Sequence, residues 1–229
     1  MDSSETPLTY STHVVADQTR PYKARHIGHD GKKHLFVLIG CPGTGKTTIA
    51  RLLSIALEKA IVVSRDNLRS KYTINSRQGD NDIARRLDEI FFSQAENLLP
   101  ICDNVILDAT FRSTALRERA YELAARNNCE LFVIQCECPF MTALNRLKKQ
   151  EDNKIKVFEE PIDLILRYYW QSFNRVEDDV YAINVLTVNT EKGQIVINSL
   201  QPPSFSSIVN IFGILQRSIK KNQKGFGEK

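Results

Sequence analysis

The sequence predicts an α/β fold, in which a mainly parallel sheet carries helices on both faces. Short apolar segments alternate along the chain with longer segments of helical periodicity. The apolar segments contain few polar residues, which is typical of parallel strands buried on both faces. A glycine-rich turn joins the first of these segments to the helix that follows. With 229 residues, of which 42% are hydrophobic and 25% charged, the chain suits one such domain with short extensions.

The first strand–helix unit contains a phosphate-binding loop. A strand is predicted over Leu35–Ile39 and a helix over 48–59, and the turn between them fits the pattern G-x-x-x-x-G-K-[ST]. In such a loop the backbone N–H groups face phosphate oxygens, and the next helix adds its positive end. The predicted nucleotide-binding residues are Gly40, Cys41, Pro42, Gly43, Thr44, Gly45, Lys46, Thr47 and Thr48. Lys46 is expected to bind the β- and γ-phosphates, and the Thr47 hydroxyl to bind Mg²⁺. We therefore expect a nucleotide such as ATP, with Mg²⁺.

The middle of the chain repeats the alternation. A strand over 61–63 leads to Ser64-Arg65-Asp66, and residues 71–82 are expected to form a loop. An amphipathic helix follows over 83–99 and stops at Pro100. The remaining predicted elements here are a strand over 105–107, a helix over 114–127 and a strand over 131–135.

The last third of the chain contains a charged break between two helices. One helix is predicted over 139–150, residues 148–160 form a lysine-rich lid, and Pro161 starts the next helix. That helix is expected to bury an apolar stripe formed by Ile162, Ile165, Leu166, Tyr169, Phe173 and Val176. Residues 183–200 read as strand, turn and strand, and a final helix covers about 205–220.

Three regions follow from this division of the chain. Residues 1–33 are a polar extension whose histidines are not predicted to bind a metal, residues 34–220 are the domain, and residues 221–229 are a basic tail. We see no internal repeat and no linker long enough to divide the domain.

Several charged residues are candidates for chemistry because ligands bind beyond the carboxyl ends of parallel strands. Asp108 follows an apolar strand, and its carboxylate is expected to hold Mg²⁺. Asp66 follows another strand and is the best candidate for the base that takes a proton from an acceptor hydroxyl. Arg69 lies on the same face of a helical turn and can clamp an anionic group of the acceptor. Arg146, which precedes the lid, is expected to contact the nucleotide.

Weaker candidates surround these residues. Arg112, Arg85 and Arg86 can form a basic rim for a phosphate-bearing acceptor, although ordinary surface arginines fit the pattern equally well. Asn189 and Thr190 are candidates for contacts with adenine.

Composition limits the possible environments of the protein. The chain has a net charge of +4, which permits a nucleic-acid partner without implying one. It has no apolar run long enough to cross a membrane and no signal-peptide pattern. Its five irregularly spaced cysteines predict free thiols. We expect a cytoplasmic protein or one delivered into a host cytosol, and no membrane partner.

Residues 35–200 resemble the P-loop kinase family that includes phage polynucleotide kinase and the kinase modules of bacterial RNA-repair enzymes. The matching segments are Gly40–Thr48, Ser64–Arg69, Val105–Thr110 and the lid leading to Pro161-Ile162-Asp163. The resemblance implies a P-loop kinase fold with a small lid. It also implies that Asp66 is the general base, that Arg69 holds the 3′-phosphate of the acceptor, and that Lys46 and Thr47 bind phosphate and metal.

Two departures from that family concern the acceptor. Phe111 stands where polynucleotide kinases usually have Asn, and Lys148 and Lys149 stand where the lid usually offers an arginine. The sequence is also similar to a wider group that includes zeta toxin, gluconate kinase and antibiotic phosphotransferases.

Three functions remain open on the sequence alone. The first is an ATP- and Mg²⁺-dependent kinase that phosphorylates a hydroxyl, with the 5′-OH of RNA or DNA as the first choice of acceptor. The second is a kinase acting on a sugar, a metabolite or an antibiotic. The third is a non-catalytic nucleotide-binding regulator. A GTPase is disfavoured because no Asn-Lys-x-Asp motif is present and no glycine lies two residues after Asp108.

Overall fold

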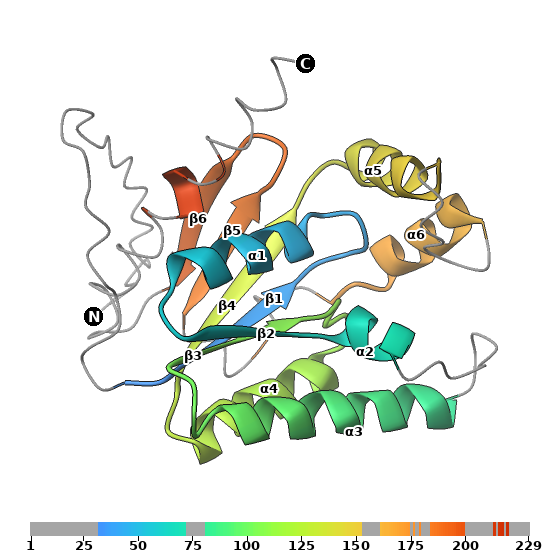
Figure 1. Ribbon diagram of the computed structural model, residues 1–229. Helices are drawn as coiled ribbons and strands as arrows, with labels where there is room; N and C mark the ends of the chain where they lie inside the picture. Colours follow the sequence, from blue (N-terminus) through green and yellow to red (C-terminus); the bar gives the residue numbers. More distant parts are fainter. Residues whose placement is uncertain are drawn as a thin grey trace, which may run out of the picture.

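The predicted parallel sheet is present in the protein. A computed structural model describes residues 32–71, 81–152, 161–174, 176, 179, 184–199, 213, 215–217 and 219. The sheet has six strands in the order β2-β3-β1-β4-β5-β6, and all neighbours run parallel except β5 and β6 (Figure 1). The strands are β1 (His34–Ile39), β2 (Ala60–Ser64), β3 (Asn104–Asp108), β4 (Glu130–Glu137), β5 (Val185–Asn189) and β6 (Gln194–Ser199).

The helices connect these strands largely as predicted. They are α1 (Lys46–Ala56), α2 (Arg65–Lys71), α3 (Asn81–Leu98), α4 (Thr114–Arg126), α5 (Phe140–Asp152) and α6 (Ile162–Gln171). Helix α1 starts and ends earlier than predicted, and Lys59 beyond its end has a positive φ of 44° that no helix can contain. Five described residues within the predicted last helix, 213, 215–217 and 219, are helical.

Strand β1 separates two hydrophobic cores, because alternate side chains of a strand point to opposite faces of the sheet. Phe36 and Leu38 belong to the core that α1 covers, together with Leu215 from the last helix. Leu35, Val37 and Ile39 belong to the core that α3 and α4 cover, on the opposite face of the sheet in Figure 1. Every residue of β1 is buried, as its unbroken apolar run predicts for a central strand.

A short helix, α2, follows the predicted second strand and takes in the first residue of the predicted loop. Strand β2 ends at Ser64, and Asp66 lies in the first turn of α2 rather than at the end of a strand. The Ser64 hydroxyl accepts a hydrogen bond from the backbone N–H of Asn67 at 3.4 Å, so Ser64 caps this helix. The predicted loop over 71–82 shrinks at both ends, since α2 includes Lys71 and α3 begins at Asn81. Residues 72–80 lie outside the described part.

A third, smaller core joins α5 and α6 at the carboxyl ends of the strands. It contains Ala143, Leu144 and Leu147 from α5 with Ile162 and Leu166 from α6. Helix α5 continues to Asp152, so the first five residues of the predicted lid, 148–152, are its last turn. The rest of the lid, 153–160, lies outside the described residues, as do residues 1–31 of the predicted extension and the tail at 221–229.

The apolar stripe predicted for the helix after Pro161 is only partly helical. Ile162, Ile165 and Leu166 are buried in α6. Helix α6 ends at Gln171, so Phe173 and Val176 reach the core from beyond the helix. No helix within the described ranges is long and apolar enough to span a membrane.

A buried polar group lies at the opposite end of the sheet from the phosphate loop, where β1, β3 and β4 begin. The Asn104 side-chain nitrogen donates to the Glu58 carbonyl at 2.7 Å, which leaves its oxygen to accept from His34 Nδ1 at 3.0 Å. His34 Nε2 is 3.5 Å from a Glu130 carboxylate oxygen. Neither of these two atoms has a hydrogen-bond partner among the described residues.

Candidate nucleotide site

The loop between β1 and α1 depends on glycines that no other residue can replace without strain. Gly43 has a φ of 76°, and a Cβ there would lie 2.6 Å from the Ala143 carbonyl oxygen. At Gly40, with a φ of 147°, a Cβ would lie 2.5 Å from the Cys136 carbonyl oxygen. Both contacts are shorter than real Cβ atoms show, and both φ values lie in a region that favours glycine. Packing against α5 and β4 therefore fixes the curl of the loop.

Hydrogen bonds inside the loop hold it closed on the Cys41 carbonyl. This oxygen accepts from the Thr44 hydroxyl at 2.8 Å and from Lys46 Nζ at 2.9 Å. The backbone N–H of Thr44 points to the same oxygen at 3.3 Å. The two donors of Thr44, its hydroxyl and its backbone N–H, thus bond within the loop. The Lys46 ammonium lies at the end of a flexible side chain, so it can leave this carbonyl and bind a phosphate instead.

Helix α1 directs its positive end into the loop. It begins at Lys46, after Gly45 with a φ of 92°, and its first turn contains no acidic residue. The unpaired N–H groups of a helix N-terminus favour an anion, and no carboxylate of the first turn competes for them here. The loop and helix therefore form a site suited to the phosphates of a nucleotide.

Thr47, in the first turn of α1, meets Asp108, the last residue of β3, because β1 leads through the loop into α1 and pairs with β3. The Thr47 hydroxyl donates to the Asp108 carboxylate at 2.8 Å. Burial raises the pKa of Asp108, while the bond from Thr47 and the charge of Lys46 lower it and the Asp66 carboxylate raises it further.

The donor pair of Thr47 and Asp108 fits Mg²⁺, which takes oxygen ligands and keeps several waters. Within the described ranges no group of three or more His, Cys, Asp and Glu side chains is arranged to enclose a metal. A cation here would therefore take its other ligands from the nucleotide and from water.

Asp66 and Arg69 both lie exposed on α2, three residues apart on one helical face. Neither forms an ion pair with another described residue, so the two do not form the surface pair that their spacing allows. Their neighbour Arg65 instead bonds Asp88 of α3 at 2.6 Å, which ties α2 to α3. The side chains of Asp66 and Arg69, both predicted to act on the acceptor, are therefore accessible to a ligand.

Arg146 bonds both the phosphate loop and Thr190, the residue that the sequence suggested as an adenine contact. Its guanidinium donates to the Thr190 hydroxyl at 2.9 Å and to the Gly43 carbonyl at 3.2 Å. The Thr190 hydroxyl in turn donates to the Thr44 carbonyl at 2.8 Å. Thr190 therefore anchors the loop. The Asn189 side-chain oxygen accepts from the backbone of Glu191 and Lys192 within the β5–β6 turn, so it is committed there.

The predicted basic rim is only partly present. Arg85 pairs along its own helix with Glu89 at 2.7 Å and Asp82 at 3.7 Å, and its neighbour Arg86 is exposed on α3. Arg112 instead lies on the segment that follows Asp108 and runs beside the loop, since the Gly40 N–H donates to the Thr110 carbonyl at 3.2 Å. Arg112 therefore lies beside the loop.

All five cysteines are free, as predicted from their spacing. Burial raises the pKa of the Cys41 thiol to about 11, although Lys46 lowers it, and burial raises that of Cys136 to about 12. Both remain neutral thiols near neutral pH and behave as small apolar side chains.

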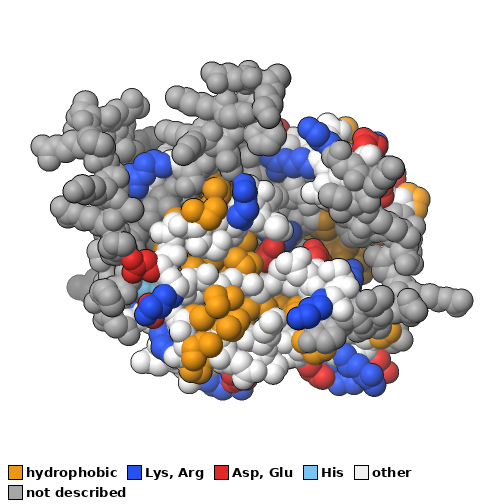
Figure 2. All heavy atoms as spheres, viewed as in Figure 1, with side chains coloured by type: hydrophobic (Ala, Val, Ile, Leu, Met, Phe, Trp, Pro, Cys, Tyr) orange, Lys and Arg blue, Asp and Glu red, His pale blue; other side chains and the backbone are white. Residues whose placement is uncertain are grey.

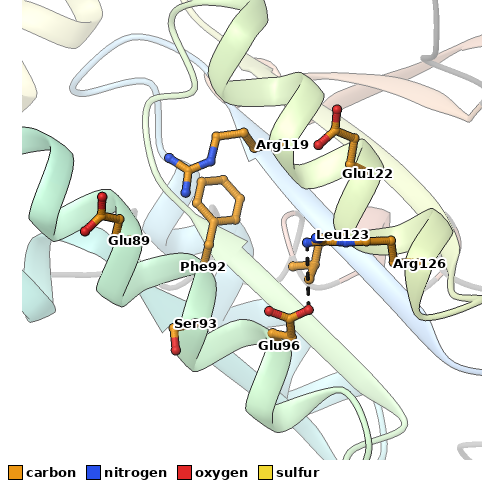
Figure 3. A pocket seen from close by; sticks show the side chains of 8 residues that line it. All are labelled: Glu89, Phe92, Ser93, Glu96, Arg119, Glu122, Leu123 and Arg126. Carbon is orange, nitrogen blue, oxygen red and sulfur yellow. Dashed lines mark ion pairs between the residues drawn. The ribbon is translucent and has the colours of Figure 1, made fainter.

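A separate hollow of about 290 Å³ lies between α3 and α4, on the sheet face opposite α1. Figure 3 shows its lining side chains, in which Arg119 lies 4.4 Å over the Phe92 ring and Arg126 pairs with Glu96 at 3.7 Å. The arginines of this hollow are thus already engaged by neighbours. We assign it no role.

Solved structures share this fold. A candidate kinase of Chloroflexus aurantiacus has a TM-score of 0.56 at 18% identity, covering 69% of this chain and 89% of its own. Chaetomium thermophilum Kti12, in complex with ADP-AlF3, has a TM-score of 0.54 at 21% identity, covering 68% and 88%. A Deinococcus radiodurans tunicamycin resistance protein has a TM-score of 0.51 at 11% identity, covering 83% and 95%. Comparison with proteins of curated function found no match.

The sequence family described as an AAA domain matches residues 35–171, a segment inside the predicted domain of residues 34–220. The ends of that domain stay predictions. The match covers more than half of the chain and includes the phosphate loop, Asp66, Asp108 and α6. The protein therefore has the P-loop kinase fold and belongs to the AAA domain family.

Proposed function

We propose that this protein is a kinase that transfers the γ-phosphate of ATP to a hydroxyl group, with the 5′-OH of a polynucleotide as the first acceptor. The observation that carries the proposal is the bond of 2.8 Å between Thr47 and Asp108 beneath a loop that faces the positive end of α1. This arrangement unites a phosphate cradle with a pair of oxygen ligands for a cation.

Each predicted residue has a role in this reaction. The loop and Lys46 hold the phosphates, and Arg146 supports the loop through Thr190. When bound, Mg²⁺ would supply positive charge at the phosphate oxygens, held by Thr47 and Asp108. Asp66 takes the proton of the acceptor hydroxyl. The hydroxyl oxygen attacks the γ-phosphorus, and the bond between that phosphorus and the departing ADP breaks. Arg69 holds an anionic group of the acceptor.

The surroundings of Asp66 support its assignment as the base. It is exposed at the carboxyl end of the sheet, forms no ion pair with a described residue, and its charge is felt at Asp108. A group that must accept a proton from an incoming hydroxyl needs this combination of access and nearness to the phosphates.

The test compares the transfer of labelled phosphate from ATP to a 5′-OH oligonucleotide by wild type, Asp66→Asn and a matched control, Asp82→Asn. Asp82 is another exposed aspartate in the first turn of a helix, but on α3. We expect the first variant to lower kcat by about a hundredfold or more, with unchanged affinity for a non-hydrolysable ATP analogue. The control should behave as wild type.

Other outcomes separate the remaining functions. Transfer by Asp66→Asn at the wild-type rate would show that Asp66 is not the base. Transfer to a sugar, a metabolite or an antibiotic in place of the oligonucleotide would make the protein a small-molecule kinase. Nucleotide binding without transfer to any hydroxyl would favour a regulator.

A further inference from the structure

Arg112 has an unusual environment at the edge of the nucleotide site. Its guanidinium lies 4.8 Å from the centre of the Tyr168 ring and 5.3 Å from that of Tyr169. Within the described ranges, the hydrogen bond that it donates is long, to the Ser172 hydroxyl at 3.3 Å. Among the described residues it forms no ion pair with a carboxylate. A half-buried guanidinium with five N–H donors thus keeps most of them available.

The backbone holds Arg112 in place from both sides. Phe111 has a positive φ of 48°, a strained value for a bulky residue, and its buried ring packs against Phe91 and Phe92. The fully buried Arg117 donates to the Phe111 carbonyl at 3.0 Å and to the Arg112 carbonyl at 3.4 Å. The core therefore fixes the backbone that presents Arg112.

This cluster adjoins the phosphate loop. The Cys41 thiol of the loop donates to the Tyr169 carbonyl at 3.6 Å. In Figure 1 both α2, which carries Asp66, and α6, which carries the tyrosines, lie at the carboxyl ends of the parallel strands. The cluster thus stands on the side of the loop from which an acceptor can approach.

We propose that Arg112 and Tyr168 form an acceptor subsite for a nucleotide unit, with a phosphate on the guanidinium and a base stacked on the Tyr168 ring. This inference rests on the proposed function, and it names the parts of the acceptor that this site recognises. The phosphate is one other than that assigned to Arg69.

The chemistry of the two side chains favours such a ligand. Tyr168 is 57% exposed although it is a large aromatic residue, so part of its ring remains uncovered beyond the arginine. Arginine binds phosphate through paired N–H groups, and bases stack on tyrosine regardless of their identity. On the face in Figure 2, basic and acidic side chains are interspersed and form no broad basic surface.

The experiment measures binding and phosphorylation of short 5′-OH oligonucleotides. Trp170, the single tryptophan of the chain, lies two residues from Tyr168, so its fluorescence reports binding without any need for catalysis. One series of oligonucleotides carries a neutral methylphosphonate at the first or the second linkage from the 5′ end. A second series lacks one base at either of the first two positions.

Two variants and one control match these probes. Arg112→Gln removes the cation, and Tyr168→Leu removes the ring. Arg167→Gln is the control. Arg167 lies on α6 next to Tyr168, and like Arg112 it stacks on an aromatic ring, that of Phe140 at 5.4 Å. For the two test variants we expect a weakening of roughly tenfold to a hundredfold on the unmodified oligonucleotide, with unchanged affinity for the ATP analogue.

The modified oligonucleotides identify the contacts. The defect of Arg112→Gln should vanish on one of the methylphosphonates, and that of Tyr168→Leu on one of the abasic strands, since a contact already lost cannot be lost twice. Equal defects on every oligonucleotide, or a defect equal to that of Arg167→Gln, would overturn the subsite while phosphotransfer by wild type still stands. A wild-type protein that neither binds nor phosphorylates any of the strands would overturn the polynucleotide acceptor and the subsite together.

Discussion

Replacing Arg117 by Met tests how the segment beyond α6 is attached to the domain. Arg117 is fully buried, and its Nε and Nη2 atoms each lie 2.5 Å from an oxygen of Asp179, which is also buried. Nη1 donates to the carbonyls of Phe111 at 3.0 Å and Asn174 at 3.1 Å. Met has a similar length but no donor, so it removes all of these bonds together.

We expect this change to lower the free energy of unfolding by about 4 kcal/mol, the usual cost of breaking a buried ion pair on one side. Most of the cost comes from the Asp179 carboxylate, which stays buried and loses its cation. The Tyr121 hydroxyl remains as a donor at 2.5 Å, and both burial and Asp179 raise its pKa, so it stays a neutral phenol. A domain of ordinary stability, about 5–15 kcal/mol, tolerates this loss and remains measurable.

Urea unfolding followed by circular dichroism measures the effect. The control is Arg126→Met, because Arg126 is an exposed arginine of the same helix that pairs with Glu96 at 3.7 Å, and it should cost less than about 1 kcal/mol. In the double variant Arg117→Met with Asp179→Asn, the loss of the unpaired charge should restore about 2 kcal/mol. If Arg117→Met costs no more than the control, or the double variant recovers nothing, this account of the buried pair is wrong.

Two further predictions concern other buried carboxylates. Because burial raises the pKa of Asp108, its contribution to stability is full at low pH and is lost as the pH rises through that pKa. Asp108→Asn should therefore raise the melting temperature of the nucleotide-free protein at neutral pH and abolish stabilisation by magnesium nucleotide, and a lower melting temperature would contradict this. Glu130→Gln should add roughly 1–2 kcal/mol to the free energy of unfolding in urea, because the amide can donate to His34 Nε2, which faces a carboxylate 3.5 Å away. A less stable variant would contradict that reading.

Much of the fold was predictable because it depends on local pattern. Unbroken apolar runs predicted the buried strands, and helical periodicity predicted α3 and α4 to within a few residues. The short helix α2 was missed apart from a turn at Arg69, because seven polar-rich residues with one buried side chain carry little periodic signal. The strand order β2-β3-β1-β4 could not be predicted from local pattern, because these strands are similarly apolar and their composition does not favour one neighbour over another.

The candidate site divides in the same way. Lys46 and Thr47 follow from the motif, and Asp108 from its place after an apolar strand. Thr190 as an anchor of the loop was not predictable, because its partner Arg146 is 44 residues away and the sequence of either gives no hint of the other. The same holds for Arg112 beside Tyr168, where nothing but the packing of α6 against the segment after β3 brings cation and ring together.

The sequence by itself determined that a phosphate-binding loop is present, since three glycines, a lysine and a threonine stand at fixed spacing between a strand and a helix. Tertiary structure alone decided which charged side chains lie near that loop and which form ion pairs elsewhere in the protein. Arg85 pairs along its own helix and Arg117 is buried with an aspartate 62 residues away, while Arg112 stays available. The physical reason is that an ion pair depends on distance and burial, and both are set by how the helices pack on the sheet.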